Sequence, residues 1–228
     1  MKPDLLTNEF LSSSDFDDIV SLNKCYTLGV GYCYVKQVVD LFKANNKLYR
    51  FFDVKWGRCG TTYLFSALNP ADVLVITAWQ NSAITCNHTD TLFRVWRAIL
   101  SNLASIDVPM TVFEMPAAWH RSCHFDMLGT TALKQHIQSR TSAYRTQVVE
   151  PSLGSQVQYI DLATLVSEDS PVLLENVNDQ RGVSSPWHAA DSFVQLLGQF
   201  HIDKLNQGVN TNDFETRLFK YLKENAYE

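Results

Sequence analysis

Five short apolar runs, separated by stretches of helical periodicity, dominate the pattern of this chain. Each run has the length and the aromatic or β-branched content of a strand. They cover Tyr26–Val30, Tyr49–Val54, Val73–Ala78, Met110–Met115 and Val157–Leu162. Val73–Ala78 is apolar at almost every position, which is typical of a parallel strand covered on both faces. The pattern therefore predicts five buried strands.

Amphipathic stretches between and after these runs predict helices. Apolar residues at Val35, Val38, Val39 and Phe42 follow the helical period, and Asn45–Asn46 is expected to end that helix. Shorter helical segments are expected over Phe16–Asn23 and between the glycine-bearing loop Gly57–Thr62 and Leu68. The longer predicted helices cover Thr89–Ile106, Thr131–Tyr144, His188–Asn206 and Phe214–Asn225.

Strands that alternate with helices imply right-handed crossovers and a parallel sheet. We therefore expect a three-layer α/β/α fold with a mostly parallel five-stranded sheet of the flavodoxin-like kind. The expected organisation is a single domain over residues 1–228, with an N-terminal extension at 1–24 and a C-terminal helix within 209–228.

Composition excludes several classes of partner. Apolar residues make up 46% of the chain and charged residues 19%, which is ordinary for a globular protein. A net charge of -5 argues against nucleic acid, because phosphate neutralisation needs a surplus of Lys and Arg. The longest apolar run, Val73–Trp79, is far shorter than the roughly 20 residues of a membrane span.

The chain also lacks the marks of an exported protein. No apolar stretch near Met1 is similar to a signal peptide. The cysteines are odd in number and widely dispersed, unlike a disulfide framework. They are Cys25, Cys33, Cys59, Cys86 and Cys123. These features favour an intracellular location.

The candidate chemistry lies in the loops that follow the strands, because parallel sheets bind ligands outside the carboxyl ends of their strands. In Ser184-Ser185-Pro186-Trp187-His188, a capping serine and a proline precede His188 at the predicted start of a helix. A histidine at this edge can act as a general base near neutral pH. The alternative is a surface histidine that merely follows a capping motif.

Two further loops offer hydrogen-bond donors. Trp79-Gln80-Asn81 directly follows a predicted strand, and its amides can stabilise a developing oxyanion. The backbone N–H of Gly60 can serve the same end. The alternative for both segments is that they form turns.

The order of these features resembles the SGNH (GDSL-like) hydrolases, including their PC-esterase-like branch of glycan O-acetylesterases. The resemblance implies that Gly29-Val30-Gly31 stands where that family has Gly-Asp-Ser, so Gly31 replaces the nucleophilic serine. It implies that Gly60 and Asn81, or less well Gln80, form the oxyanion hole. His188 then matches the catalytic base.

The same resemblance leaves the base without its usual orienter. The position of the family's aspartate, three residues before His188, holds Ser185, and Asp179 is a candidate orienter from the preceding loop. A triad needs a positioned hydroxyl and an acid that fixes the imidazole tautomer. We therefore expect a domain that has lost the serine-esterase mechanism and acts as a binding or assembly module. The alternative is an active esterase on an acyl or O-acetyl glycan substrate, using His188 with a non-standard nucleophile.

The same loops carry residues that suit other classes of ligand. Trp119-His120-Arg121 and Arg58 can line a pocket for an anionic or sugar ligand, and the alternative is that Arg121 is a solvated loop charge. Trp79 is a further candidate binding residue, and an acyl or glycan compound is the expected ligand. A zinc site from Cys86-x-His88 and His120-x-x-Cys123-His124 is a further alternative, against aromatic packing or turn roles for the same residues. No metal is expected. No cofactor is expected either, since the chain has no P-loop and no G-x-G-x-x-G after a strand.

Overall fold

The computed structural model describes most of the predicted elements. The described residues are 26–31, 34–53, 69–77, 89–116, 135, 139, 142–143, 145–152, 154–166, 170 and 189–225. The predicted N-terminal extension at 1–24 and the predicted helix at Phe16–Asn23 lie outside them, as does the predicted segment from Gly57 to Leu68.

Five parallel strands form one sheet. They are β1 (Thr27–Gly31), β2 (Tyr49–Asp53), β3 (Asp72–Thr77), β4 (Met110–Glu114) and β5 (Val157–Asp161). Their order is β2-β1-β3-β4-β5, and every neighbouring pair is parallel. This is the flavodoxin-like order, with its switch point between β1 and β3. The prediction of a five-stranded parallel sheet is confirmed.

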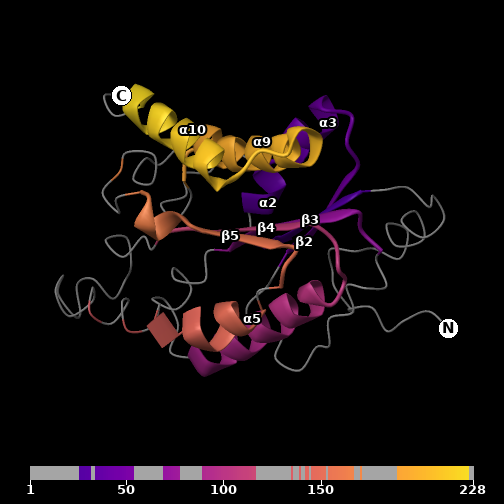
Figure 1. Ribbon diagram of the computed structural model, residues 1–228, viewed down its shortest axis with the longest axis vertical. Helices are drawn as coiled ribbons and strands as arrows, with labels where there is room; N and C mark the ends of the chain where they lie inside the picture. Colours follow the sequence, from indigo (N-terminus) through magenta and orange to yellow (C-terminus); the bar gives the residue numbers. More distant parts are fainter. Residues whose placement is uncertain are drawn as a thin grey trace.

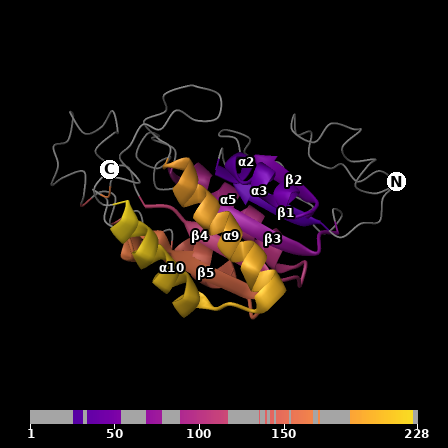
Figure 2. The ribbon, with the colours of Figure 1, turned by 90° about the horizontal axis from the view of Figure 1, so that it is seen from above.

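Helices cover both faces of the sheet, which gives three layers (Figure 1). One face carries α2 (Tyr34–Gln37), α3 (Val39–Ala44), α9 (Asp191–Gln207) and α10 (Thr211–Glu224), and the other carries α5 (Thr89–Ala104). Figure 2 shows α9 lying over the middle strands and α10 over β4 and β5. The remaining helical pieces are short: η3 (Arg145–Val149), α7 (Glu150–Ser152) and η4 (Leu162–Thr164). Residues 135, 139, 142 and 143 of the predicted helix at Thr131–Tyr144 are also helical.

The core consists of two apolar layers, one on each side of the sheet. In β3, Val73 and Val75 join the layer beneath α5, whereas Leu74 and Ile76 join the layer beneath α9. All six residues of β3 are buried. Side chains alternate between the faces of a strand, so a strand covered on both sides must be apolar throughout. This is the physical reason for the continuous apolar run that marks β3 in the sequence.

Glycines let the helices of one face approach the sheet and one another. A Cβ at Gly29 would lie 1.9 Å from the hydroxyl oxygen of Tyr49, whose O–H donates to the carbonyl of Val35 at 2.9 Å. A Cβ at Gly198 in α9 would lie 2.8 Å from Cγ1 of Val38. These two contacts seat the α2–α3 segment between the sheet and α9.

One predicted helix is interrupted, and the predicted start of another is wrong. The single helix expected from Val35 is two short helices, because the chain turns at Val38; adjacent β-branched residues there lower helix propensity. Helix α9 begins at Asp191 instead of His188, since Ala190 has non-helical dihedral angles of φ -53° and ψ 139°. The N-cap residue of α9 is Ala190, and Ser184 to His188 lie outside the described residues.

Candidate functional site

The carboxyl edge of the sheet, where the sequence predicts the ligand site, is described in part. Of the candidate residues, Gly31 lies within the described residues at the end of β1. The other candidates lie outside them: Arg58, Gly60, Trp79, Gln80, Asn81, His120, Asp179 and His188. The positions of the zinc alternative also lie outside, namely Cys86, His88, His120, Cys123 and His124. The roles of these residues stay predictions.

Gly31 is held where no side chain fits. Its φ is 157°, a conformation that side chains rarely adopt. A Cβ at this position would lie 2.2 Å from the carbonyl oxygen of Ile76 in the neighbouring strand β3, well inside the 3.0 Å limit of real Cβ contacts. It would also lie 3.2 Å from Cγ1 of Val35. Position 31 therefore accepts glycine alone unless the strands move apart.

Three polar residues end adjacent strands at this edge, although the sequence reasoning did not select them. Thr77 ends β3, Glu114 ends β4 and Asp161 ends β5, and each is the Cα partner of the next. Thr77 and Glu114 are buried. Asp161 pairs with Arg145 and accepts the N–H of Ala163 at 3.0 Å. A polar residue closing an apolar run was the available sequence signal.

The start of α9 is anchored beside the helix that follows β1. Nε2 of Gln37 in α2 donates to the carboxylate of Asp191, and Nε2 of Gln195 donates to the backbone carbonyl of Gln37 at 2.8 Å. Ala189, which follows His188 in the sequence, is buried. From here α9 runs antiparallel to the strands, toward their amino-terminal ends.

At the amino-terminal edge of the sheet, α9 contributes a buried histidine that bridges two strands. His201 is fully buried; its Nε2 lies 2.8 Å from Oδ1 of Asp72, the first residue of β3. Its Nδ1 lies 2.9 Å from Oγ1 of Thr111 in β4. Nζ of Lys204, one helical turn further along α9, donates to Thr111 Oγ1 at 3.1 Å and to the Met110 carbonyl at 3.2 Å.

These contacts define a directed hydrogen-bond chain. A carboxylate only accepts, so Nε2 of His201 carries the proton that is donated to Asp72. Nδ1 then accepts from the hydroxyl of Thr111, and that hydroxyl accepts from the ammonium of Lys204. Burial lowers the pKa of His201 below its ordinary 6.5, although the carboxylate of Asp72 opposes the shift. The imidazole is therefore neutral at pH 7.

The ammonium of Lys204 is affected by the same environment. Burial lowers its pKa, and the carboxylate of Asp72 works in the opposite direction. The hydroxyl of Thr111, the imidazole of His201 and the carboxylate of Asp72 follow one another in the order of a catalytic triad. However, the exposed fraction of Thr111 is 0%, so a substrate cannot reach its hydroxyl. The chain of hydrogen bonds therefore joins α9 to β3 and β4 instead of performing acyl transfer.

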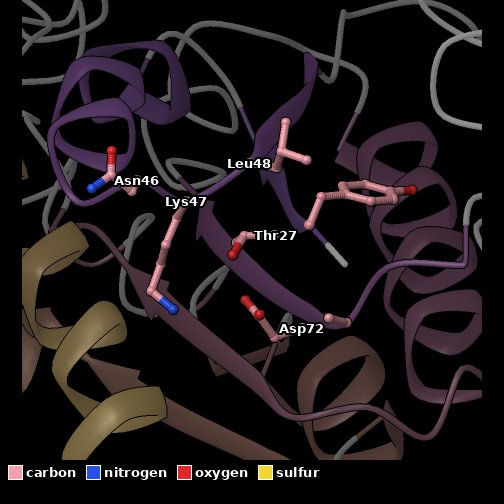
Figure 3. A pocket seen from close by; sticks show the side chains of 7 residues that line it. Thr27, Asn46, Lys47, Leu48 and Asp72 are labelled. Atoms are coloured by element: carbon pink, nitrogen blue, oxygen red, sulfur yellow. The ribbon is translucent and has the colours of Figure 1, made fainter. Parts of the chain in front are cut away.

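Beside this network lies a pocket of about 450 Å³ (Figure 3). Its walls come from the start of β1, the turn before β2 and the start of β3. The lining residues are Tyr26, Thr27, Asn46, Lys47, Leu48, Ala71 and Asp72. Asp72 thus faces both the pocket and His201.

The sequence reasoning missed this edge, because it followed the rule that ligands bind at the carboxyl ends of parallel strands. Two signals were present in the sequence. An acidic residue, Asp72, opens the most apolar strand, and His201 interrupts the apolar stripe of a helix between Phe200 and Ile202. A partner 129 residues away is not apparent from either signal alone.

Among the described residues, no group of three or more His, Cys, Asp or Glu side chains is arranged to hold a metal ion. Within the same part of the chain, no helix combines the length and the apolar character needed to cross a membrane.

Comparison with known proteins finds similarity among solved structures alone: no family model and no curated protein matches the chain. A proposed acylhydrolase from Bacteroides fragilis is 18% identical, with a TM-score of 0.45 over 80% of this chain and 88% of that one. A family two carbohydrate esterase from Clostridium thermocellum, solved with cellohexaose, is 10% identical with a TM-score of 0.45 over 81% and 65%.

A third similar structure is the N-terminal part of a Bacteroides fragilis protein that contains a phosphatase domain and was solved with magnesium. It is 8% identical, with a TM-score of 0.46 over 82% of this chain and 53% of that one. At these identities and TM-scores, the three structures assign no activity to this chain.

Proposed function

We propose that this chain is an SGNH-like domain that has lost the serine-esterase mechanism and acts as a binding or assembly module. The ligand class that we propose is an acyl or O-acetyl glycan compound, bound at the carboxyl edge of the sheet. His188, Asn81 and Gly60 are the proposed polar contacts, and Trp79 and Arg58 the proposed walls.

The geometry of Gly31 carries this proposal. Acyl transfer by the serine mechanism needs a side-chain oxygen at the end of β1, the place that the resemblance gives to Gly31. A serine there would bring its Cβ to 2.2 Å from the carbonyl oxygen of Ile76. The spacing of β1 and β3 therefore leaves room only for glycine at position 31. The proposed loss of the serine mechanism then has two causes, the missing hydroxyl and the close packing of the backbone.

One experiment tests binding and turnover together. An O-acetylated oligosaccharide and its deacetylated counterpart are incubated with the protein, and ligand-observed NMR follows both contact and the release of acetate. We expect saturation transfer to the acetylated ligand while the signal of free acetate stays at the level of the protein-free control. Absence of contact would refute the ligand class, and acetate release above the control would refute the binding role in favour of the esterase alternative.

The esterase alternative is measured with 4-nitrophenyl acetate and a fluorophosphonate probe. The control is His136→Ala, a histidine of the predicted helix Thr131–Tyr144 that is not a candidate site residue. We expect the wild-type protein, His188→Ala and His136→Ala to hydrolyse the ester at one common low rate, without labelling by the probe. Turnover that falls in His188→Ala but not in His136→Ala would establish the esterase instead. A Gly31→Ser variant is also expected to remain unlabelled, since its hydroxyl cannot be placed without displacing β3.

A further inference from the structure

The pocket at the amino-terminal edge carries two opposite charges that do not contact each other. Lys47 and Asp72 both line it, and they approach from different elements (Figure 3). Among the described residues, no ion pair of 4.0 Å or less joins these two side chains. The ammonium of Lys204 acts on the carboxylate of Asp72 from α9, whereas Lys47 is the cation that lines the pocket together with Asp72.

The carboxylate of Asp72, which is the negative group of the pocket, is held in place by His201. Oδ1 of Asp72 accepts the Nε2–H of His201 at 2.8 Å, and His201 is itself held by Thr111 at 2.9 Å. The neutral imidazole orients the carboxylate without cancelling its charge. The side chain of Asp72 is 11% exposed, so its charge is partly removed from water and gains more from a cationic partner than a surface carboxylate would.

Lys47, which is the positive group of the pocket, is positioned by the turn before β2. Asn46 has a left-handed φ of 55°, and the N–H of Lys47 donates to the carbonyl of Phe42 at 2.9 Å. On the other side, the carbonyl of Leu48 accepts the N–H of Thr27 at 2.9 Å. These bonds fix the backbone on both sides of Lys47 and direct its side chain along the pocket (Figure 3).

We propose that this pocket binds a small zwitterion, whose ammonium group meets Asp72 and whose carboxylate meets Lys47. Thr27 and Asn46 supply the neutral polar groups of the same wall. The volume of about 450 Å³ lies in the range of small-molecule sites. The site is at the opposite edge of the sheet from the proposed glycan site, so each can fail without the other.

The test uses amino acids of increasing charge separation. Glycine, β-alanine, 4-aminobutyrate and 6-aminohexanoate are titrated into the full chain by calorimetry, with propionate and propylamine as single-charge controls. We expect one separation to bind best and both controls to bind at least about tenfold more weakly, because each lost charge-assisted hydrogen bond costs a factor of that order. Failure of every zwitterion to bind at millimolar concentration would overturn the proposal.

Variants of the pocket residues test whether the zwitterion binds in this pocket. Lys47→Met and Asp72→Asn are each expected to weaken the best zwitterion by about tenfold or more. Lys43→Met is the matched control, since this exposed lysine pairs with Asp40 at 3.4 Å and does not line the pocket. Lys47 is half-buried and bonds through its backbone, so its variant is expected to fold even if Asp72→Asn disturbs His201. Equal affinity in Lys47→Met and Lys43→Met would overturn the assignment.

Discussion

A methyl group added at Gly31 is the sharpest perturbation that the structure offers. In Gly31→Ala, the new Cβ would lie 2.2 Å from the Ile76 carbonyl oxygen, in a backbone conformation with φ 157°. Overpacking a close-packed site costs about 1–3 kcal/mol. A strained backbone conformation costs about 1–3 kcal/mol more. We therefore expect Gly31→Ala to lower the free energy of unfolding by about 2–6 kcal/mol, a large part of the stability of an ordinary domain.

Two other glycines separate the cost of the steric clash from the cost of the strained backbone conformation. Gly208 has a left-handed φ of 69° with nothing within 4 Å of a built Cβ, so Gly208→Ala measures conformational strain without a clash. Gly154 has open space around it and no positive φ, so Gly154→Ala is expected to change stability by less than about 0.5 kcal/mol. Gly31→Ala must therefore cost more than either variant.

Urea and thermal unfolding provide the measurement. At the low end of the expected range, the melting temperature falls by about 4–8 °C for a chain of this size. A Gly31→Ala protein as stable as Gly154→Ala would show that β1 and β3 adapt without cost. The packing argument against a serine at position 31 would then be refuted, and with it the observation that carries the proposed function.

Two further predictions concern α9 and α10. The pKa of His201 is lowered below its unfolded value of 6.5, so its contribution to stability is complete above pH 6.5 and is lost as the pH falls toward the folded pKa. The free energy of unfolding is measured by urea titration between pH 7.5 and 5.5. It should fall more steeply in the wild type than in His201→Gln, by up to about 1.4 kcal/mol per pH unit. An equal pH dependence of the two proteins would contradict this prediction. Asn210 caps α10 by accepting N–H groups of Asn212 and Asp213 in a capping box, so Asn210→Ala should cost about 1 kcal/mol by the same titration. The exposed helical Asn206→Ala is its control, and an equal loss there would show that the cap contributes nothing.

The strands and layers of this protein follow from local pattern. A strand covered on both faces must be apolar throughout, so Val73–Thr77 is recognisable in the sequence before any partner is known. The end of the first helical region is also local: Asn46 takes a left-handed φ, and the amide of Asn45 donates to the Leu41 carbonyl at 2.9 Å. The parallel direction of the strands then follows from the helices that connect them.

Tertiary structure decided what local pattern does not contain. The start of α9 depends on a non-helical Ala190 and on the hydrogen bond from Gln37 to Asp191, which joins residues 154 positions apart. The pocket beside Asp72 exists because the backbone brings together the starts of β1 and β3 and the turn before β2, three segments that are separate in the sequence. The sequence shows only that Gly31 lacks a side chain; the fold shows that the carbonyl oxygen of Ile76 occupies the space that a side chain would need. The periodicity of apolar residues in the sequence indicates whether a residue is buried. The residues that cover it come from distant segments of the chain, so they are known only from the tertiary structure.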